Sequence, residues 1–570
     1  MSPPSSPTVS SRLSSSRGSV GILAGGSCTT GRRDLSSFEP EGGRTPRGGA
    51  LIQTSRDDDL RMADGGRWTW SFGPADEALT RVLILLAIGA LWLRPIGSSF
   101  WLDELGTYWV VRDGFGDMVR LALRYQGQSP LYYLVAWAAR IVGDGSEVIM
   151  RLPSLAAAAL ATYVLARLAR RLFGPRGAWA SAVAFAVTPI VAFSAIDARP
   201  YAFAYLALSL ATVGLVNLSE RGDPRWGAAY GASVAGTVHF HYLFAFALLG
   251  HLPYLASRWP RMDPSARRGL WLAGGTAAVL LLPLAPQVRY LVEHARIPDL
   301  PLGRPSFATF LDTLIPVPVL AAALLGVFVA WWTGALELRA RAQREGLLLA
   351  AGLSLAPSVG LLLFSVFSGI NLLWETYTRS SAVGAALLLG GAIAAIGPAR
   401  AYRIVLLVTV IFALLTTGGR WHSDQDWRGA AAEVNALVHD PSTPVLMHAA
   451  FIEGAHVEFF DDPEHRSQLL AQLSRYPVEG SVVPVPYNLT GESERYLEKV
   501  VVPKVTASDG FVLVTLEPIA PFAEWLQARL GPLGFESRQV GEHGAVRVTV
   551  FQRGGSLRSA VQPTTGAMPA

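Results

Sequence analysis

Two adjacent carboxylates, Asp103 and Glu104, lie in the apolar stretch FWLDELGTYW, which covers residues 100–109. Their neighbours are tryptophan, leucine and tyrosine, so we expect a partly buried site. An unpaired buried carboxylate is unfavourable, and acids in such places often do chemistry. A carboxylate can take a proton from a reacting hydroxyl as a general base. The competing interpretation is that Asp103 is a solvated residue at a helix end.

A second polar stretch, Asp197-Ala-Arg-Pro-Tyr, opens another apolar segment. Asp197 is suited to cap a helix and Pro200 to occupy its first turn, so both have a structural explanation. Arg199 is harder to explain in this way, because a guanidinium beside a helix N-terminus can bind phosphate oxygens. The alternative for Arg199 is that it reaches toward lipid headgroups.

Further polar groups separate later apolar segments: His239 and His241, and a loop that contains Glu375, Tyr377 and Arg379. The histidines are two residues apart, and no Cys or His lies nearby with the spacing of a zinc site. These histidines could hydrogen-bond to a substrate, or they could simply lie at the membrane interface without a functional role.

The composition indicates a membrane protein. The chain has 570 residues, of which 51% are hydrophobic and only 16% charged, whereas a soluble globular protein carries about 25% charged residues. The positive charge behind the net value of +5 lies in short arginine clusters between apolar runs. This pattern is typical of membrane topology signals and not of a nucleic-acid surface. Cys28 is the single cysteine, which excludes a disulfide framework and a cysteine-based metal site.

Residues 78–419 alternate apolar runs with short polar breaks. A membrane-spanning helix needs about 20 apolar residues, and about eleven candidates follow from this rule. They are 79–97, 149–170, 178–196, 200–218, two helices within 226–257, then 269–290, 314–334, 346–367, 381–397 and 403–418. Two shorter helices, 116–126 and 130–143, are expected in a large first loop. The second is too short to span, so we expect it at or partly in the membrane interface.

The flanking segments differ from this apolar region. Residues 1–77 are rich in Ser, Gly, Arg and Pro and are expected to form a disordered tail, as are residues 556–570. Residues 420–555 are expected to form a soluble α/β domain, with strands in PVLMHAA, GFVLVTLE and AVRVTVFQR and helical patterns between them.

The arginine clusters also predict an orientation, because positively charged loops stay on the cytoplasmic side. With the N-terminus inside, every short arginine-rich loop falls inside as well. The acid pair, the Asp197 stretch, the two histidines, the Glu375 loop and residues 420–555 then lie together on the outer face. Ionisable groups at membrane depth are usually functional.

Five stretches, in this order and spacing, resemble the motifs of bacterial polytopic glycosyltransferases of the GT-C superfamily. They are FWLDELGTY, QSPLYYL, MRLPSL…RRLFG, IDARPYAF and DWRGAAA. The set they resemble most includes protein O-mannosyltransferases, lipid A aminoarabinose transferases and polyprenyl-donor glycosyltransferases of the lipopolysaccharide core (families 39 and 83). The resemblance covers about residues 80–555 and implies a GT-C-like fold with many transmembrane helices and a large first outer loop. It also implies a polyprenyl-phosphate-linked sugar donor, with the acid pair and Asp197 in the catalytic site.

The resulting prediction is an inverting glycosyltransferase in the bacterial plasma membrane. Asp103 would be the base and Glu104 a second or orienting carboxylate, while Asp197 would position the acceptor or a cation. Moving a sugar off a lipid phosphate also requires cationic donors to the phosphate. The substrate-binding candidates are Arg199 and Arg379 for the phosphate, with Tyr132, Tyr201, His239, His241, Glu375 and Tyr377.

The expected partners are the lipid bilayer, the lipid-linked donor and an envelope glycan, lipid or protein hydroxyl, but no nucleic acid. No cofactor is required by the sequence, although an acidic cluster can hold Mg²⁺ or Mn²⁺. Two alternatives remain at this stage: a transporter or flippase of a lipid-linked solute, and a non-catalytic envelope scaffold. Transporters usually place their charges at the bilayer midplane within repeated halves, which favours the enzyme here.

Overall fold

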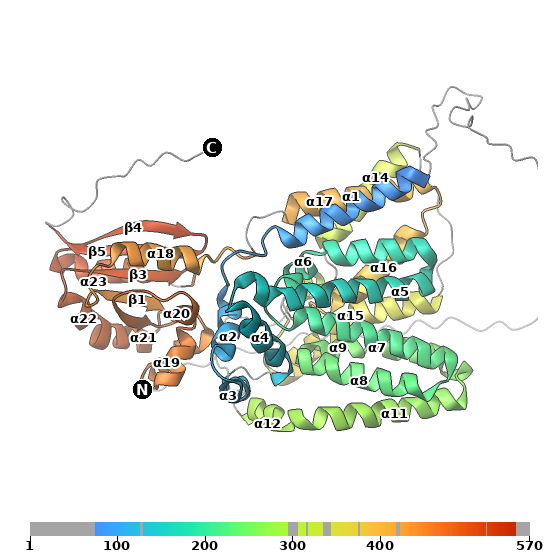
Figure 1. Ribbon diagram of the computed structural model, residues 1–570, viewed down its shortest axis with the longest axis horizontal. Coiled ribbons are helices and arrows are strands. Elements are labelled where there is room, and N and C mark those ends of the chain that lie inside the picture. The colour runs from blue at the N-terminus through green and yellow to red at the C-terminus, as the bar shows by residue number, and fades with distance from the viewer. Residues whose placement is uncertain are drawn as a thin grey trace, which may run out of the picture. The chain divides into compact units, whose positions relative to one another are not determined.

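The computed structural model describes residues 74–125, 129–293, 306–314, 317–334, 344–373, 377–417, 422–519 and 521–554 (Figure 1). Cys28, Glu375 and the predicted C-terminal tail lie outside the described residues. So does the predicted N-terminal tail up to residue 73. The prediction extended that tail too far, because residues 74–77 form the first turn of a helix.

A helical bundle makes up the region expected to span the membrane. Its helices are α1 (Pro74–Leu93), α2 (Leu102–Val111), α3 (Phe115–Tyr125), α4 (Pro130–Gly143), α5 (Glu147–Val187), α6 (Pro189–Ala195), α7 (Tyr201–Arg221), α8 (Pro224–Phe240), α9 (Ala245–Leu248), α10 (His251–Arg258), α11 (Pro264–Leu281), α12 (Ala285–Glu293), α13 (Phe307–Leu314), α14 (Val317–Trp332), α15 (Arg344–Ser368), α16 (Ser381–Ala394) and α17 (Ala399–Thr417). Within the described residues, five helical stretches are long and apolar enough to cross a membrane: Glu147–Val187, Tyr201–Arg221, Pro264–Arg289, Arg344–Ser368 and Ala399–Thr416. The shorter helices α14 and α16 are also apolar.

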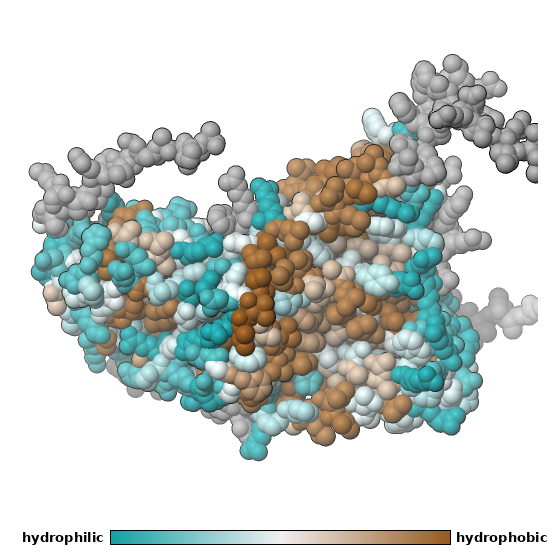
Figure 2. All heavy atoms as spheres, in the orientation of Figure 1, coloured by the Kyte–Doolittle hydropathy of each residue, from teal (hydrophilic) through white to brown (hydrophobic). Residues whose placement is uncertain are grey.

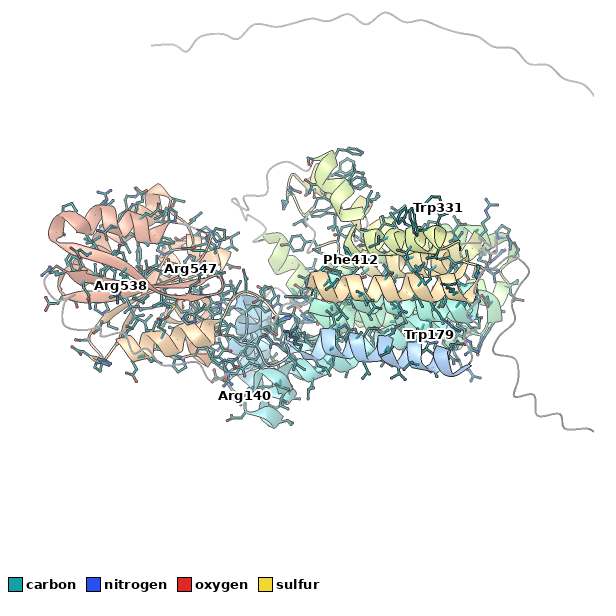
Figure 3. The ribbon with its side chains drawn as sticks, turned by 90° about the horizontal axis from the view of Figure 1, so that it is seen from above. Arg140, Trp179, Trp331, Phe412, Arg538 and Arg547 are labelled. Carbon is teal, nitrogen blue, oxygen red and sulfur yellow. The ribbon has the colours of Figure 1, made fainter. Side chains whose placement is uncertain are left out.

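The surface of the bundle supports a membrane position. Figure 2 shows hydrophobic side chains over the middle of the helices and hydrophilic ones at the end farthest from the sheet. Trp331 of α14 and Phe412 of α17 are two of the large apolar side chains that the bundle carries (Figure 3), and Trp331 is exposed. Exposed apolar area of this extent suits contact with lipid chains and not with water.

Helix α5 contains a break that the sequence predicted as a turn between two helices. Gly174 has φ 81° and ψ −173°, so the helical conformation stops there and resumes at Pro175. A positive φ of this kind is readily adopted only by glycine, and proline is favoured at the start of the following helix. The predicted segments 149–170 and 178–196 therefore correspond to the two halves of α5, with α6 completing the second.

The large first loop contains three short helices. Two of them, α3 and α4, match the helices expected at 116–126 and 130–143. The Ser129 side chain caps α4 by accepting a hydrogen bond from the Leu131 backbone. Helix α2 was not predicted, and it carries the acid pair in its first turn. A helix N-terminus is a favourable position for negative charge because its free N–H groups point outward.

The C-terminal region contains a five-stranded mixed sheet in the order β2-β1-β3-β5-β4. Strands β1 (Pro444–His448), β3 (Gly510–Leu516) and β5 (Val546–Arg553) confirm the three predicted strands, whereas β2 (Ser481–Val485) and β4 (Phe535–His543) were missed. Strand β1 pairs in parallel with β2 and β3, and β5 pairs antiparallel with β3 and β4. The helices of this region are α18 (Trp427–Leu437), α19 (Pro463–Leu469), α20 (Gln472–Arg475), α21 (Gly491–Tyr496), α22 (Val502–Thr506) and α23 (Phe522–Leu530). Arg538 on β4 and Arg547 on β5 mark the sheet in Figure 3.

The sheet region packs directly on the first loop. Buried residues of α2, α3 and α4 form a single hydrophobic core with residues of α18, β1 and β3. Polar contacts reinforce it: the Trp109 indole donates to Ser467, and the Tyr476 hydroxyl donates to Glu147 at 2.9 Å and accepts from the Phe100 backbone. The first loop is therefore held between the membrane helices and the sheet region.

Candidate active site

Glu104 forms a fully buried ion pair with Arg151 of α5. Arg151 Nε lies 2.8 Å from Glu104 Oε1, and a second nitrogen lies 2.5 Å from Oε2; both side chains have no solvent exposure. The same guanidinium donates to the backbone carbonyls of Ile96, Ser98 and Ser99. Arg151 thus links the start of α5 to the segment that leads into α2.

The remaining acceptor capacity of Glu104 is also used. Its Oε1 accepts a hydrogen bond from the Ala198 backbone at 2.8 Å, and its Oε2 accepts one from the Trp101 backbone at 3.3 Å. Glu104 therefore ties together α2, α5 and the Asp197 stretch. With every oxygen engaged, this carboxylate is suited to hold the site in shape and less suited to take a proton.

Asp103, the neighbour of Glu104 on α2, is accessible. Its side chain is 34% exposed, and Oδ2 lies 3.8 Å from a nitrogen of Arg199. Burial raises the pKa of Asp103 above its ordinary value, and the nearby carboxylates Asp197 and Glu104 raise it further against the opposing effect of Arg199. Burial and like charge both disfavour the ionised form, which makes this carboxylate a stronger base than an ordinary one.

Asp197 is fully buried and does not cap α7. The N-cap position of α7 belongs to Pro200, which makes no capping hydrogen bond, so the predicted helix cap at Asp197 and first-turn position of Pro200 are wrong. Asp197 Oδ1 accepts a hydrogen bond from the Trp101 indole at 3.0 Å. Its Oδ2 meets no hydrogen-bond partner within the described part of the chain. Buried polar atoms are almost always satisfied, so this oxygen is available to a ligand.

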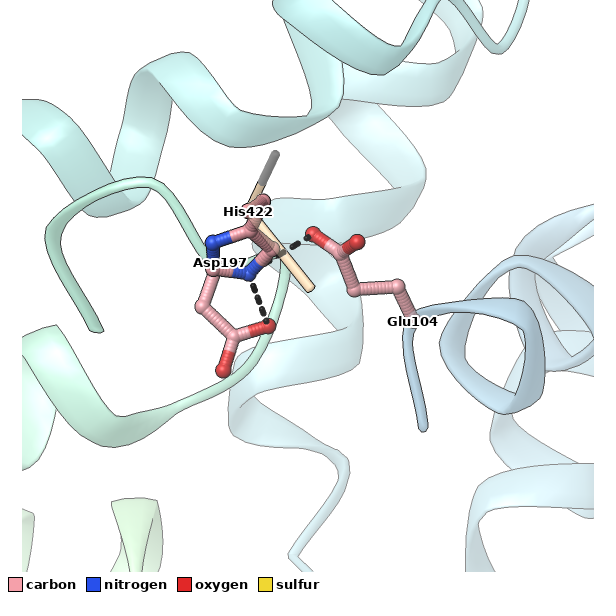
Figure 4. Close-up of side chains that lie close together, drawn as sticks. All are labelled: Glu104, Asp197 and His422. Atoms are coloured by element: carbon pink, nitrogen blue, oxygen red, sulfur yellow. Dashed lines mark ion pairs between the residues drawn. The ribbon is translucent and has the colours of Figure 1, made fainter. Parts of the chain in front are cut away.

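His422 completes a cluster that the sequence did not reveal. Its Nε2 lies 3.5 Å from Asp197 Oδ1 and 3.9 Å from Glu104 Oε1. Figure 4 marks both contacts with dashed lines. The imidazole stacks on Phe193 with ring centres 4.1 Å apart. Neither ring nitrogen makes a hydrogen bond to a described residue.

Glu104, Asp197 and His422 are grouped closely enough to surround a metal ion. Each offers one ligand atom, and the atoms lie within 4.8 Å of one another. Glu104, however, is already saturated by Arg151 and two backbone N–H groups. Asp197 and His422 alone fall short of the oxygen-rich coordination that Mg²⁺ requires. Of these three side chains, two therefore remain as ligands for a cation such as Mg²⁺ or Mn²⁺.

Two buried arginines line the site beside Asp103. The Arg379 guanidinium lies over the Tyr201 ring, 4.1 Å from its centre, a cation–π arrangement that fixes its plane. Arg379 Nε and Nη1 and Arg199 Nε are buried without an acceptor among the residues described. Unused guanidinium donors of this kind suit an anionic ligand such as a phosphate.

Of the other predicted residues, His241, Tyr377 and Tyr132 lie near the residues of the site, whereas the ring nitrogens of His239 bond elsewhere. His241 lies by Tyr201, with ring centres 5.2 Å apart. Burial and the charges of Tyr201 and Asp103 raise the pKa of Tyr377, so Tyr377 lies near these groups. Tyr132 is buried, and the nearby charge of Asp197 adds to the effect of burial in raising its pKa.

His239 has a different environment. Its two ring nitrogens lie 2.8 Å from the Ser129 hydroxyl and 2.9 Å from the Leu280 carbonyl. Both are hydrogen-bonded to the protein, so His239 links α8 to the start of α4 and to α11.

The sheet region also contributes a carboxylate near Asp103. Glu453 lies in a short 3₁₀ segment, Ile452–Ala455. Burial raises the pKa of Glu453, and the charge of Asp103 raises it further. Glu453 is therefore within electrostatic range of Asp103. No local pattern predicts this interaction, because 350 positions separate the two residues.

Comparisons with known proteins identify the architecture. Residues 128–286 match the family model described as dolichyl-phosphate-mannose-protein mannosyltransferase. No curated protein matches the chain significantly. The crystal structure of ArnT from Cupriavidus metallidurans in the apo state is similar at 14% identity and a TM-score of 0.51, covering 84% of this chain and 98% of that one. ArnT from the same organism bound to undecaprenyl phosphate gives 12% identity and a TM-score of 0.49 with the same coverage.

Proposed function

We propose that this chain, a multi-pass membrane protein with the fold of the GT-C superfamily of glycosyltransferases, moves a sugar from a polyprenyl-phosphate-linked donor to an envelope hydroxyl. The observation that carries the proposal is a partly exposed carboxylate, Asp103, beside the buried and incompletely bonded guanidinium groups of Arg199 and Arg379. This combination supplies a base and a phosphate site together, which sugar transfer from a lipid phosphate requires.

The family model that matches residues 128–286 is named for dolichyl-phosphate mannose as the donor and protein as the acceptor. Dolichyl phosphate is a polyprenyl-type phosphate, so the match supports a donor of this class. The acceptor that we propose is a hydroxyl of an envelope glycan, lipid or protein.

The reaction would proceed as a single displacement. Asp103 takes the proton of the acceptor hydroxyl as its oxygen bonds to the anomeric carbon. The bond from that carbon to the phosphate oxygen breaks, and the polyprenyl phosphate leaves with the bonding electron pair. Arg199 and Arg379 stabilise the negative charge that develops on the phosphate. Attack opposite to the leaving group inverts the anomeric configuration, as in inverting glycosidases.

The proposed orientation places this chemistry on the outer face of a bacterial plasma membrane. Arg151 and Arg171 are both on the first half of α5, 20 residues apart in sequence. At 1.5 Å per residue their separation is about 30 Å, the thickness of the hydrocarbon layer. The arginine-rich end would then face the cytoplasm and the acid pair the opposite side.

Sugar transfer by purified protein tests the proposal. Wild type and Asp103→Asn in lipid nanodiscs would receive a panel of short-chain polyprenyl-phosphate sugars and an envelope extract from a strain that lacks the gene. We expect sugar incorporation with wild type and a loss of about 10²–10⁴-fold with the variant, the usual contribution of a general base. Asp113→Asn is the matched control, since Asp113 is exposed and pairs with Arg112.

Full transfer by a folded Asp103→Asn protein would overturn the role of Asp103. If the labelled donor instead moves across the proteoliposome membrane and no sugar is transferred, the result would support a transporter of a lipid-linked solute.

A further inference from the structure

A cleft lies between the first half of α5 and α7, at the end of both that is farther from Asp103. Four arginines line it, Arg167, Arg170, Arg171 and Arg221, and the cleft has a volume of about 500 Å³. Nothing in the proposed sugar transfer uses these side chains. All four are exposed.

The charge of this cleft is only partly compensated. Arg171 donates to Asn217 Oδ1 and pairs with Glu220, which fixes its position. Arg221 contacts the face of Trp226, 5.8 Å from the ring centre. Within the described residues, Arg167 and Arg170 form no ion pair. Four guanidinium groups and one carboxylate leave a strongly positive surface.

Apart from the arginines and Asn217, the lining is apolar. The apolar lining residues are Leu168 of α5 and Val213 and Val216 of α7. Leu168 and Val216 are buried beneath the cleft, whereas Val213 is partly exposed to it. A cleft with a charged rim and an apolar wall suits an amphipathic anion. Basic pockets between membrane helices on the cytoplasmic side bind lipid phosphates in this way.

We propose that this cleft binds a phosphate group whose attached chain or body packs against Val213 and the aliphatic stems of the arginines. Such a phosphate belongs either to an anionic phospholipid or to a soluble phosphate compound. The site is independent of the sugar-transfer site, because the two lie at opposite ends of the first half of α5 and of α7, about 30 Å apart by helix rise.

Binding to delipidated protein in detergent tests the proposal. Native mass spectrometry would record adducts with phosphatidylglycerol, with phosphatidylcholine and with inorganic phosphate. We expect wild type to bind phosphatidylglycerol in preference to phosphatidylcholine, and the double variant Arg167→Gln/Arg170→Gln to bind it at least about tenfold more weakly, a loss of about 1.4 kcal/mol. Arg171 is left intact because its bonds to Asn217 and Glu220 join α5 to α7.

The control is Arg225→Gln, since the Arg225 side chain is 93% exposed and lies outside the cleft. If inorganic phosphate displaces phosphatidylglycerol and binds the wild type with the same affinity, the cleft is a phosphate site whose ligand is a soluble phosphate compound. Wild-type affinity for phosphatidylglycerol in the double variant, at unchanged melting temperature, would overturn the proposal. Asp103→Asn is expected to bind the lipid normally, so failure of the sugar-transfer proposal is distinguishable from failure here.

Discussion

Glu104 and Arg151 form an ion pair with no solvent exposure on either side chain, and this pair joins α2, α5 and the Asp197 stretch. Two charges in a medium of low polarity are stable only when each is fully compensated. Here the guanidinium bonds to three backbone carbonyls besides Glu104. The adjacent acids of FWLDEL therefore differ in kind: Glu104 holds the site together, and Asp103 faces the space where a substrate would bind.

Removing one partner of this ion pair is expected to destabilise the protein strongly. Arg151→Met leaves Glu104 buried without a counter-charge, which costs about 3–5 kcal/mol. The melting temperature in detergent should fall markedly, and the double variant Glu104→Leu/Arg151→Met should recover part of the loss because no lone charge remains. Arg225→Gln serves as the control for loss of an exposed arginine. A wild-type melting temperature for Arg151→Met would show that the pair is not structural.

The pH dependence of transfer is expected to report the ionisation of Asp103. The base must be ionised to accept a proton, so kcat/KM should rise with pH toward a plateau. Its midpoint should lie above the ordinary carboxyl value of 3.8, because burial and the neighbouring carboxylates raise the pKa of Asp103. Asp197→Asn removes a negative charge and should lower this midpoint, whereas Arg199→Gln should raise it. Identical acid limbs in wild type and both variants would contradict this assignment.

The two arginines beside Asp103 should contribute to donor binding and to the transition state. A hydrogen bond from a charged group is worth about 1.5–3 kcal/mol, so Arg199→Gln and Arg379→Gln should each lower kcat/KM by about 10–100-fold. Arg379→Lys keeps the charge but loses the planar stacking on Tyr201, and we expect it to restore only part of the activity. Steady-state kinetics with varied donor concentration provide the measurement. Unchanged kinetics in all three variants would remove the phosphate role.

Transfer should not depend on a divalent cation. Glu104 is saturated by hydrogen bonds, which leaves Asp197 and His422 as the available ligands of the cluster. Activity after extensive treatment with EDTA and desalting is therefore expected to equal that of untreated protein. Loss of activity that added Mn²⁺ restores would contradict this prediction and would indicate a site with further ligands.

Local patterns predicted much of the architecture. The three predicted strands, β1, β3 and β5, form the centre of the sheet. Their residues are almost all buried or partly buried, and their sequences are correspondingly apolar. The two missed strands are the sheet edges. Strand β2 contains Pro484, which an edge strand tolerates, and β4 is polar and largely exposed. Edge strands carry little of the apolar signal on which sequence prediction depends.

The site was only partly predictable for a related reason. Asp103, Asp197 and Arg199 stood out as charges in apolar surroundings, and the structure brings them together. Arg151 and His422 also contact Glu104 in the site. Arg151 is 47 positions from Glu104 in the sequence, and His422 is 318 positions from it. No periodicity connects residues at such separations. His422 reaches Asp197 through tertiary contacts: its backbone N–H donates to Ser98 and its ring stacks on Phe193.

The packing of the sheet region on the first loop should respond to pH through Glu464 of α19. Its carboxylate accepts hydrogen bonds from Tyr125 at 2.6 Å, Arg120 at 2.5 Å and Arg124 at 3.1 Å. The Tyr125 hydroxyl and the two arginines lower the pKa of Glu464 below its ordinary value of 4.5. A carboxyl group with a lowered folded-state pKa stabilises the folded state above its unfolded pKa and loses that contribution as pH falls through the lowered value.

We therefore expect this contact to persist at neutral pH and to weaken below about pH 4.5, the ordinary glutamate value. The side chains are partly exposed, so the effect should be modest, within about 1 kcal/mol. Limited proteolysis of the sheet region measures it: Glu464→Gln should be cleaved faster than wild type at pH 7, and the difference should shrink at acidic pH as wild-type Glu464 is protonated. Glu458→Gln is the matched control, because Glu458 is exposed and its recorded partner, His456, is a near neighbour in the sequence. Equal cleavage of Glu464→Gln and wild type at pH 7 would show that this cluster does not hold the sheet region to the first loop.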